Sequence, residues 1–428
     1  MEGFKLNSIN FEDNGKKICY GYSIDKAFSK YFNLDNLYYS KYQIDVSQIP
    51  DSIAVIPLLS NLMPIAWFVG FDVYVNEIDE TFYNALISLK EEFVKYNPDK
   101  NLKGELKAKS LVKNMINGSK SALLFSGGLD SFESYTRNHD LNPYLVSIHG
   151  ADIEISDTKR WEDFIRFNKE EHIIANNMLH YIETNVRDFY TYKVDVLVDI
   201  GWWGKIQHGM SLLGVLAPLS YKLNFDNILI GSSNTNEVDF GWGSSPNIDE
   251  KMKWATCNVI HDGYHLRRTN KIENIVSYVK SNNTSIKLRV CYSELRDEAN
   301  CNKCAKCQRT ILGIILANDN PEKFGFKIPE NFYNRIFLNF NKNSTMSKGL
   351  EYEWWCLQEK VKENKPFFVL NNNNEENEYL KKFAQLDLKK IINKNEEKVN
   401  KLAVKKFIIR NKFSKLYTFY KKVRYNKI

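Results

Sequence analysis

The sequence is poor in cysteine and proline, and it lacks the marks of a secreted protein. It holds seven cysteines and ten prolines in 428 residues. Four of the cysteines crowd between positions 291 and 307, unlike the even spread of a secreted disulfide scaffold. The first residues also lack the charged-then-apolar pattern of a signal peptide. These absences predict a cytoplasmic protein.

A long uninterrupted apolar run is also missing. The most apolar stretch, 53–70, has the length of a membrane span, but Pro57, Ser60, Asn61 and Pro64 interrupt it. We expect two buried strands around a turn at this place.

Acidic residues are missing from the end of the chain. From Lys401 onward there are ten Lys or Arg residues and no acid, which leaves 49 of the 59 basic residues against all 52 acids in the rest. The body is therefore nearly neutral. An anionic partner attracted by net positive charge would be attracted to the tail. With 43% hydrophobic and 26% charged residues, the chain as a whole is expected to be folded.

The length predicts two or three folded units, and the patterns divide the chain into four parts. Residues 1–118 are expected to form a small α/β domain of unknown role, with a strand at 71–75 and a helix capped by Asp79 that buries Phe82, Leu86, Leu89 and Phe93. Residues 119–318 form the central part. Residues 319–390 form an extension whose run NNNNEENE at 371–378 is typical of an exposed linker, and 391–428 form the basic tail.

In the central part, short apolar runs alternate with helical patterns. The segments 121–126, 143–150 and 227–233 are typical of buried strands, and a helical stretch at 208–223 precedes the third. This alternation predicts an α/β fold with an open, mostly parallel sheet and crossover helices. Ligands of such sheets bind at the carboxyl ends of the strands, where Asp152 and His208 are weaker site candidates. His149, next to Gly150, is expected to be a packed side chain.

The first of these strands runs directly into SGGLDS at 126–131. Gly127 and Gly128 permit a sharp turn and a close approach to a ligand, while the amides of Gly128, Leu129 and Asp130 open a helix whose positive end attracts an anion. Ser126 and Ser131 add hydroxyl donors, and Asp130 is a candidate ligand for Mg²⁺. The loop has no Lys of the GxxxxGK[ST] type, which excludes a Walker A site.

The cysteine cluster has metal-ligand spacing. Cys301, Cys304 and Cys307 are separated by two residues each, and Cys291 lies nine residues upstream of them. Four thiolates satisfy the closed tetrahedral shell of structural Zn²⁺. An iron–sulfur cluster is the alternative, although the Cys before Pro that is usual in ferredoxins is missing. Cys19, Cys257 and Cys356 are expected to be small buried side chains.

The loop and the cluster together resemble those of a known family. SGGLDS resembles the SGGxDS signature of PP-loop ATP pyrophosphatases, and this loop followed by C-x9-C-x2-C-x2-C resembles the 7-cyano-7-deazaguanine synthase (QueC) family. The resemblance covers about 119–318, including GSSNTNEVD from Gly231 onward. It implies an adenine nucleotide alpha hydrolase-like (HUP-type) sheet and a ligase that adenylates a carboxylate with release of pyrophosphate, for amide or nitrile formation with ammonia. The residues that would hold ATP are Ser126, Gly127, Gly128, Leu129, Asp130, Ser131 and Gly231.

The chain also departs from that family. Its members are compact single domains, whereas here long segments precede the loop and follow the cluster. A Tyr-Pro-Asp-Cys segment is expected after Gly231, and FGWGSSPNIDEK stands there instead. The substrate half is therefore expected to be rebuilt, and 261–271 is its best candidate. There His261 and Arg268 are candidate catalytic residues, and together with Asp262, Arg267 and Lys271 they could neutralise a carboxylate or pyrophosphate. The alternative for this segment is a solvated basic helix start with an Asp cap.

Two other functions remain open. A PP-loop tRNA thiolation enzyme would need a free catalytic cysteine or an open cluster, and a non-catalytic ATP-binding module would need only the loop. For the tail, helical spacing of Val404, Phe407, Ile408, Leu416, Phe419, Tyr420 and Val423 predicts an apolar stripe beside a basic face. The stripe would pack on the body, lie on an anionic membrane surface at the inner face of the membrane, or dock on RNA. A homo-oligomer is also among the expected partners.

Overall fold

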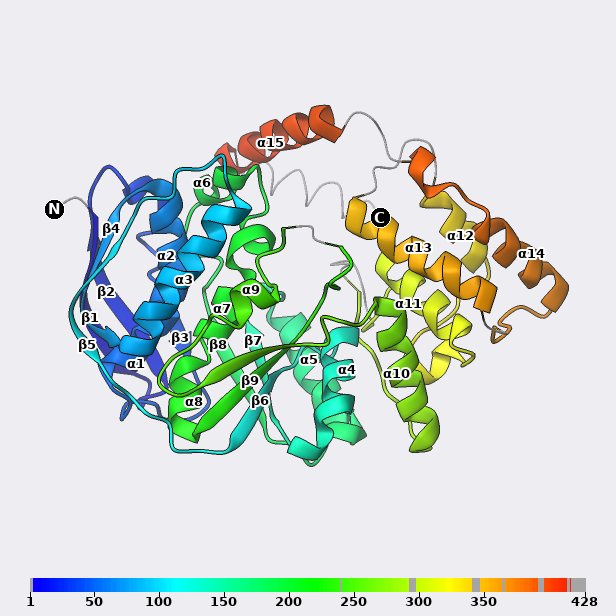
Figure 1. The fold of residues 1–428 in the computed structure, drawn as a ribbon, viewed down its shortest axis with the longest axis horizontal. Coiled ribbons are helices and arrows are strands. Elements are labelled where there is room, and N and C mark those ends of the chain that lie inside the picture. Colours follow the sequence, from blue (N-terminus) through cyan, green and yellow to red (C-terminus); the bar gives the residue numbers. More distant parts are fainter. Residues whose placement is uncertain are drawn as a thin grey trace.

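The computed structural model describes residues 3–238, 241–291, 298–340, 347–363, 366–391, 396–413 and 416. Its centre is a mixed, mostly parallel ten-stranded sheet with the strand order β10-β9-β6-β7-β8-β3-β2-β1-β4-β5 (Figure 1). The strands are β1 Gly3–Glu12, β2 Lys17–Ile24, β3 Tyr39–Lys41, β4 Asp72–Asp79, β5 Leu106–Val112, β6 Lys120–Leu124, β7 Tyr144–His149, β8 Leu179–Thr184, β9 Phe225–Gly231 and β10 Asn258–Asp262.

Five neighbouring strands of this sheet are parallel, and they include the three strands expected in the central part. The chain runs from β6 outward through β7 to β8, then returns to the other side of β6 for β9 and β10. The order therefore reverses between β6 and β9. In open α/β sheets such a reversal leaves a crevice at the carboxyl ends of the strands, where ligands bind.

The parallel strands are buried on both faces, which explains their continuous apolar runs. Alternate residues face opposite sides, so that Ala122 and Ile228 belong to one core while their neighbours Leu123 and Leu229 belong to the other. Helices α2 Ile56–Val69, α7 His208–Gly214 and α8 Ala217–Leu223 pack on the first side. Helices α4 Leu129–Asn138, α10 Arg268–Ser281 and α11 Ala305–Leu316 pack on the second.

The N-terminal segment extends the same sheet. β3 pairs with β8 in antiparallel orientation and joins β1, β2, β4 and β5 to the parallel strands. The expected strand after residue 70 is β4, and the expected helix is α3 Glu80–Tyr96, whose N-cap Asp79 accepts a hydrogen bond from the amide of Phe82 at 2.9 Å. The boundary at residue 118 therefore divides a continuous sheet and a shared core.

The expectation of two strands at 53–70 is wrong. This stretch forms α1 Asp51–Ala54 and α2, and twelve residues of α2 are buried. A helix buried on all sides has no amphipathic period, so its pattern cannot be told from that of a buried strand. Pro57 lies in the first turn, where its missing N–H costs nothing, and Pro64 is accommodated inside the helix.

The C-terminal extension is helical. It comprises α12 Phe332–Leu338, α13 Lys348–Glu363 and α14 Asn373–Ala384, and α15 Glu396–Lys412 follows. The expected linker at 371–378 is wrong, since α14 begins within it. Asn372 caps this helix by accepting from the amides of Asn374 and Glu375, and buried Glu376 accepts from the amides of Val369 and Leu370. Asn372, which was expected to belong to a linker, is thus the N-cap of a helix.

The remaining elements are short connections or cover the edges of the sheet. They are α5 Thr158–Glu170, α6 Tyr192–Asp195 and α9 Pro246–Asp249, a π-helix at Trp203–Gln207, and single 3-10 turns. Within the described part of the chain, no helix combines the length and apolar character needed to cross a bilayer.

Candidate active site at the phosphate loop

The loop Ser126–Ser131 follows β6 and opens α4, in the strand–loop–helix arrangement expected for it. Gly127 has φ +67°, and a Cβ there would meet the ring of Phe167 at 2.7 Å, so this position requires glycine. The amide of Gly128, the N-cap of α4, donates to Ser126 Oγ at 3.3 Å, and the amide of Ser126 donates to Ser131 Oγ at 3.3 Å. The two serines therefore hold the loop in shape, while the first-turn amides of α4 have no partner within the helix.

Gly231, at the end of β9, lies directly against this loop. A Cβ on Gly231 would be 2.6 Å from the carbonyl oxygen of Asp130 and 3.3 Å from the amide of Ser131. These are backbone atoms at the start of α4, which cannot swing aside as a side chain would. The glycine thus permits the close approach of β9 to the phosphate loop on the side where the strand order reverses.

Asp130 is surrounded by cations. Lys271 Nζ lies 3.5 Å from its Oδ1, and an Arg268 terminal nitrogen lies 3.9 Å from its Oδ2. Burial raises the pKa of Asp130, but the charges of Lys271, Arg268 and Lys306 outweigh it, and the pKa lies below its usual 3.8. Asp130 is therefore an ionised carboxylate. The structure brings the expected residue Arg268 to the loop together with Lys271, whose side chain is only 2% exposed.

Arg268 is held from three directions. Its Nε faces Glu353 of α13 at 3.9 Å, one terminal nitrogen faces Asp130, and the other donates to Thr310 Oγ1 at 3.3 Å. Glu353 also accepts from Nε of buried Arg309 at 2.6 Å. A guanidinium fixed in this way needs little reorganisation to receive negative charge from a ligand.

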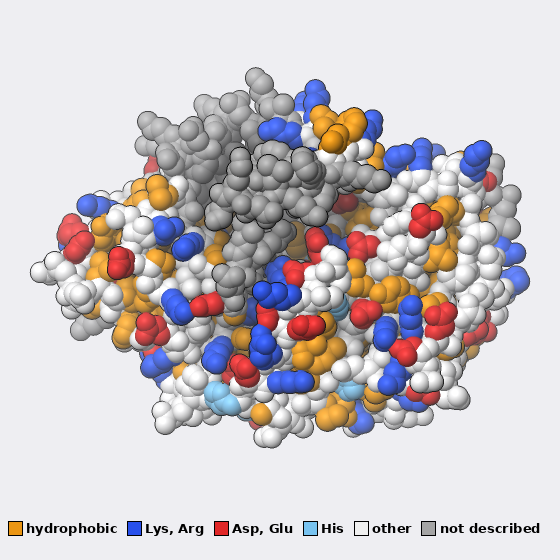
Figure 2. Space-filling view, turned by 180° about the vertical axis from the view of Figure 1, so that it is seen from behind, with side chains coloured by type: hydrophobic (Ala, Val, Ile, Leu, Met, Phe, Trp, Pro, Cys, Tyr) orange, Lys and Arg blue, Asp and Glu red, His pale blue; other side chains and the backbone are white. Residues whose placement is uncertain are grey.

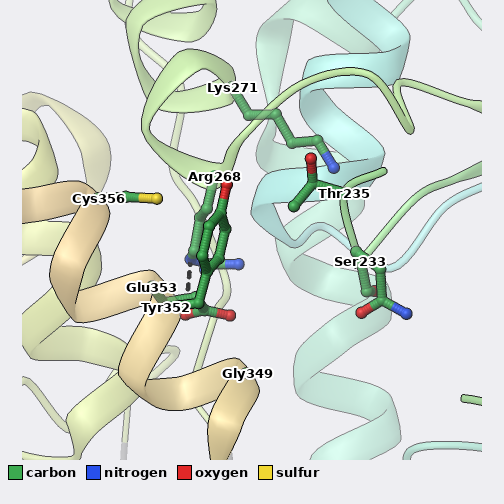
Figure 3. Close-up of a pocket in the computed structure, with 9 residues that line it drawn as sticks. Ser233, Thr235, Arg268, Lys271, Gly349, Tyr352, Glu353 and Cys356 are labelled. Carbon is green, nitrogen blue, oxygen red and sulfur yellow. Dashed lines mark ion pairs between the residues drawn. The ribbon is translucent and has the colours of Figure 1, made fainter. Parts of the chain in front are cut away.

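Helix α13 forms one wall of the pocket beside Arg268. Figure 3 shows Arg268 and Glu353 joined by their ion pair, with α13 facing the segment that carries Ser233 and Thr235 across the pocket. Gly349, Tyr352, Glu353 and Cys356 of α13 line this wall. The sequence patterns did not indicate Glu353, Arg309 or Thr310 as site residues, because a lone acid on an amphipathic helix looks like any solvated charge.

His261 lies in a buried network. Its Nδ1 is 2.7 Å from Asp249 Oδ2, and its Nε2 is 2.8 Å from Ser232 Oγ. All three side chains are buried. Both ring nitrogens are therefore engaged by protein partners, and His261 ties the ends of β9 and β10 to α9. The sequence predicted a catalytic role for His261, and the structure places it in contact with these two protein side chains.

The four cysteines of the cluster come together at the start of α11. Their sulfur atoms all lie within 4.8 Å of one another, with Cys291–Cys304 at 3.8 Å, Cys301–Cys307 at 4.0 Å and Cys304–Cys307 at 3.5 Å. Zn–S bonds of about 2.3 Å in a tetrahedron place the sulfurs about 3.8 Å apart. Hydrogen bonding with the thiols of Cys291 and Cys304, followed by burial, raises the pKa of Cys307. The four residues therefore fit a metal ion such as zinc.

Cys257 and Cys356 are buried as expected, whereas Cys19 is only half-buried. Burial raises the pKa of Cys257 to about 12 and that of Cys356 to about 11. Burial also raises the pKa of Cys19 to about 11. Such thiols are poor nucleophiles at neutral pH.

An aromatic cluster lies at the same edge of the sheet. His208 contacts the rings of Trp203 and Trp242 at centroid distances of 5.3 and 5.6 Å, and its Nε2 is 4.0 Å from Asp152. Asp152 follows β7 and Trp242 follows β9, the two strands that flank β6. The cluster therefore spans the carboxyl end of β6, from which the phosphate loop begins. His149 is instead buried and stacked on Trp161, as expected for a packed side chain.

The backbone beside this cluster is strained. Asp199, Ile200 and Gly201 have φ values of +54°, +73° and +92°, and a β-branched residue such as Ile200 rarely adopts this region. The π-helix Trp203–Gln207 follows at once. A Cβ on Gly204 would meet the indole of Trp242 at 2.5 Å, so this glycine makes room for the ring. Strained backbone and π-helices are both enriched at functional sites.

Comparison of the chain with protein-family models, curated proteins and solved structures found no match. Any functional assignment therefore depends on the residues and geometry of the chain itself.

Proposed function

We propose that this protein is an ATP-dependent enzyme of the PP-loop type, similar to the QueC family, that adenylates a carboxylate substrate and passes the acyl group to ammonia. The observation that carries the proposal is the loop Ser126–Ser131. It lies at the carboxyl end of β6 where the strand order reverses, and its Asp130 is flanked by Arg268 and Lys271. The strand order is also compatible with a HUP-type sheet.

In this proposal the phosphates of ATP bind to the first-turn amides of α4 and to the hydroxyls of Ser126 and Ser131. Asp130 would hold Mg²⁺, which would neutralise phosphate charge when bound and takes few protein ligands where phosphates supply the others. The substrate carboxylate oxygen attacks the α-phosphorus, and the bond to pyrophosphate breaks. Arg268 and Lys271 stabilise the negative charge that the leaving pyrophosphate develops.

The acyl-adenylate then reacts with ammonia. The ammonia nitrogen forms a bond to the acyl carbon, the bond from that carbon to the AMP oxygen breaks, a proton is lost from the nitrogen, and the product is an amide. A second adenylation on the amide oxygen would let that oxygen leave with AMP as the two remaining N–H protons are lost, which gives a nitrile. We assign the acceptor to the aromatic cluster of Trp203, His208 and Trp242, because these rings span the carboxyl end of β6 and the indole of Trp242 is partly exposed. Flat conjugated acids stack favourably on such rings.

The four cysteines would hold Zn²⁺ in a closed shell with no open position for a substrate, which is the pattern of a structural site. Two residues after Cys307, Arg309 contacts Glu353, so the metal site would also hold the start of α11 near the phosphate loop.

The alternative of tRNA thiolation is less well supported. Cys356 is the cysteine that lines the pocket beside Arg268, and burial raises its pKa to about 11. A sulfur carrier needs a thiolate at neutral pH. A non-catalytic ATP-binding module would hold ATP at the same loop, and it differs from the proposed enzyme in forming no AMP.

The test is product analysis with ATP, Mg²⁺, ammonia and a panel of carboxylic acids. We expect AMP and pyrophosphate, with most of the activity lost in Asp130→Ala and retained in Asp140→Ala, which changes an exposed acid just beyond α4. ADP and phosphate as products would refute the PP-loop assignment. AMP formation that requires tRNA and a sulfur donor would favour thiolation, and ATP binding without AMP under all conditions would favour the binding module.

A further inference from the structure

The C-terminal helix α15 carries apolar residues on two opposite faces. Val404, Phe407 and Ile408 are half-buried, and Phe407 and Asn411 line a cavity of about 500 Å³ together with Arg187 and Tyr190 of the body. The helix expected for the tail is present as α15, and its half-buried face attaches it to the body beside α6 (Figure 1). Phe419, Tyr420 and Val423 lie outside the described residues.

The opposite face points to solvent. Ile409 and Phe413 are 58% and 56% exposed, and Leu416 is 67% exposed. At about 100° per residue, Ile409 and Phe413 project within about 40° of each other and more than about 100° away from Phe407. Val404, Phe407 and Ile408 of the stripe expected from the sequence therefore lie on the inward face, and Leu416 of that stripe is exposed. Ile409 and Phe413, which were not part of the expected stripe, form a separate outward apolar face.

Cations lie on both sides of the outward apolar residues. At the same helical spacing, exposed Lys405 and Lys412 project to one side of Ile409, and exposed Lys406 and Arg410 project to the other. Figure 2 shows this pattern at the top of the view, where hydrophobic side chains at the position of α15 are bordered by Lys and Arg. No acid occurs in the sequence from Lys401 to the end.

We propose that the outward face of α15 binds an anionic bilayer surface, with the helix axis parallel to the membrane and the body held beneath it by the inward face. Apolar side chains bordered by cations match the acyl boundary and the charged headgroups of such a surface. A nucleic acid would use the cations, and an unpaired base could stack on Phe413, but it would leave the aliphatic side chain of Ile409 exposed, whereas a bilayer would bury both. The proposal is independent of the proposed enzymatic activity.

The experiment is flotation of the full chain with vesicles of about three parts phosphatidylcholine to one part phosphatidylglycerol, and with vesicles of phosphatidylcholine alone. We expect the protein to float with the anionic vesicles only. The double substitution Ile409→Asp and Phe413→Asp should lower the bound fraction by about tenfold, because it removes apolar contact and adds negative charge. Leu338→Asp, at an equally exposed leucine of α12 (66%), is the matched control and should leave binding unchanged.

Thermal melting of the same variants separates a docking role from a structural one. Because both side chains face solvent, the double variant should melt at the temperature of the parent. The proposal is overturned if the parent chain does not float, if the double variant floats as well as the parent, or if a version ending at Asn400 binds vesicles unchanged. Retention of an RNA oligonucleotide in place of the anionic vesicles would identify the tail as an RNA-binding element and would equally overturn it.

Discussion

Replacing Asp130 by Asn removes the central charge of the candidate site while keeping its shape. The carboxylate lies 3.5 Å from Lys271 and 3.9 Å from Arg268. With an effective dielectric constant of about 20, each attraction amounts to about 4–5 kcal/mol before the cost of burial is subtracted. Burial opposes ionisation, yet the pKa is still lowered, so the net effect favours the charged form.

The substitution leaves buried Lys271 without its carboxylate. Breaking a buried pair on one side costs about 3–5 kcal/mol. Lys271 keeps its hydrogen bond to the carbonyl oxygen of Ser232, so we expect the free energy of unfolding to fall by only about 2–3 kcal/mol. For a chain of this length, that corresponds to a fall of about 2–3 °C in melting temperature.

A double-mutant cycle with Lys271→Met isolates the pair. Both single variants and the double variant are melted under the same conditions, and we expect a coupling of about 1–3 kcal/mol between the two positions. The pH dependence has a definite sign. Because the pKa of folded Asp130 lies below its usual 3.8, the stabilisation is present above that pH and is lost as the pH falls through the folded pKa. Parent and Asp130→Asn should therefore converge in melting temperature in acid. No coupling, together with an unchanged melting temperature at neutral pH, would show that the pair does not form in solution.

Three further predictions concern the surroundings of the loop. Purified protein should carry about one zinc per chain, and Cys304→Ser should lower the melting temperature more than the affinity for ATP; iron with labile sulfide would contradict this. Gly231→Ala should cost about 1–3 kcal/mol and weaken ATP binding measured by calorimetry, because its Cβ would overlap the backbone of Asp130; unchanged affinity would show that β9 does not press on the loop. Glu353→Gln should raise the KM for ATP by loosening Arg268, whereas Glu359→Gln, whose partner is Lys362 on the same helix, should not; equal effects of the two would remove Glu353 from the site.

Local sequence patterns were enough to predict structure where the residues involved are close together in the chain. The SGGLDS loop combines a buried strand, two glycines and a helix start within a dozen residues, and the structure forms that arrangement. The cysteines lie within 17 positions of one another, and their sulfur atoms converge. The N-cap at Asp79 needed only the three residues that follow it.

Contacts between distant segments were decided by the tertiary structure alone. Glu353 reaches Arg268 and Arg309 only because α13 packs on α10 and α11, and nothing near Glu353 in the sequence records that packing. His261 was expected at the substrate, but Asp249 and Ser232 engage both its ring nitrogens.

The sequence by itself determined the strand–loop–helix at SGGLDS, the cysteine quartet and the parallel strands, because each depends on residue types at short spacing. Only the tertiary structure decided that the N-terminal strands continue the central sheet, and that 53–70 is helical. Burial on every side erases the periodicity from which secondary structure is predicted. It also decided which face of α15 meets the body, since both faces are apolar in sequence and only packing against α6 and its neighbours distinguishes them.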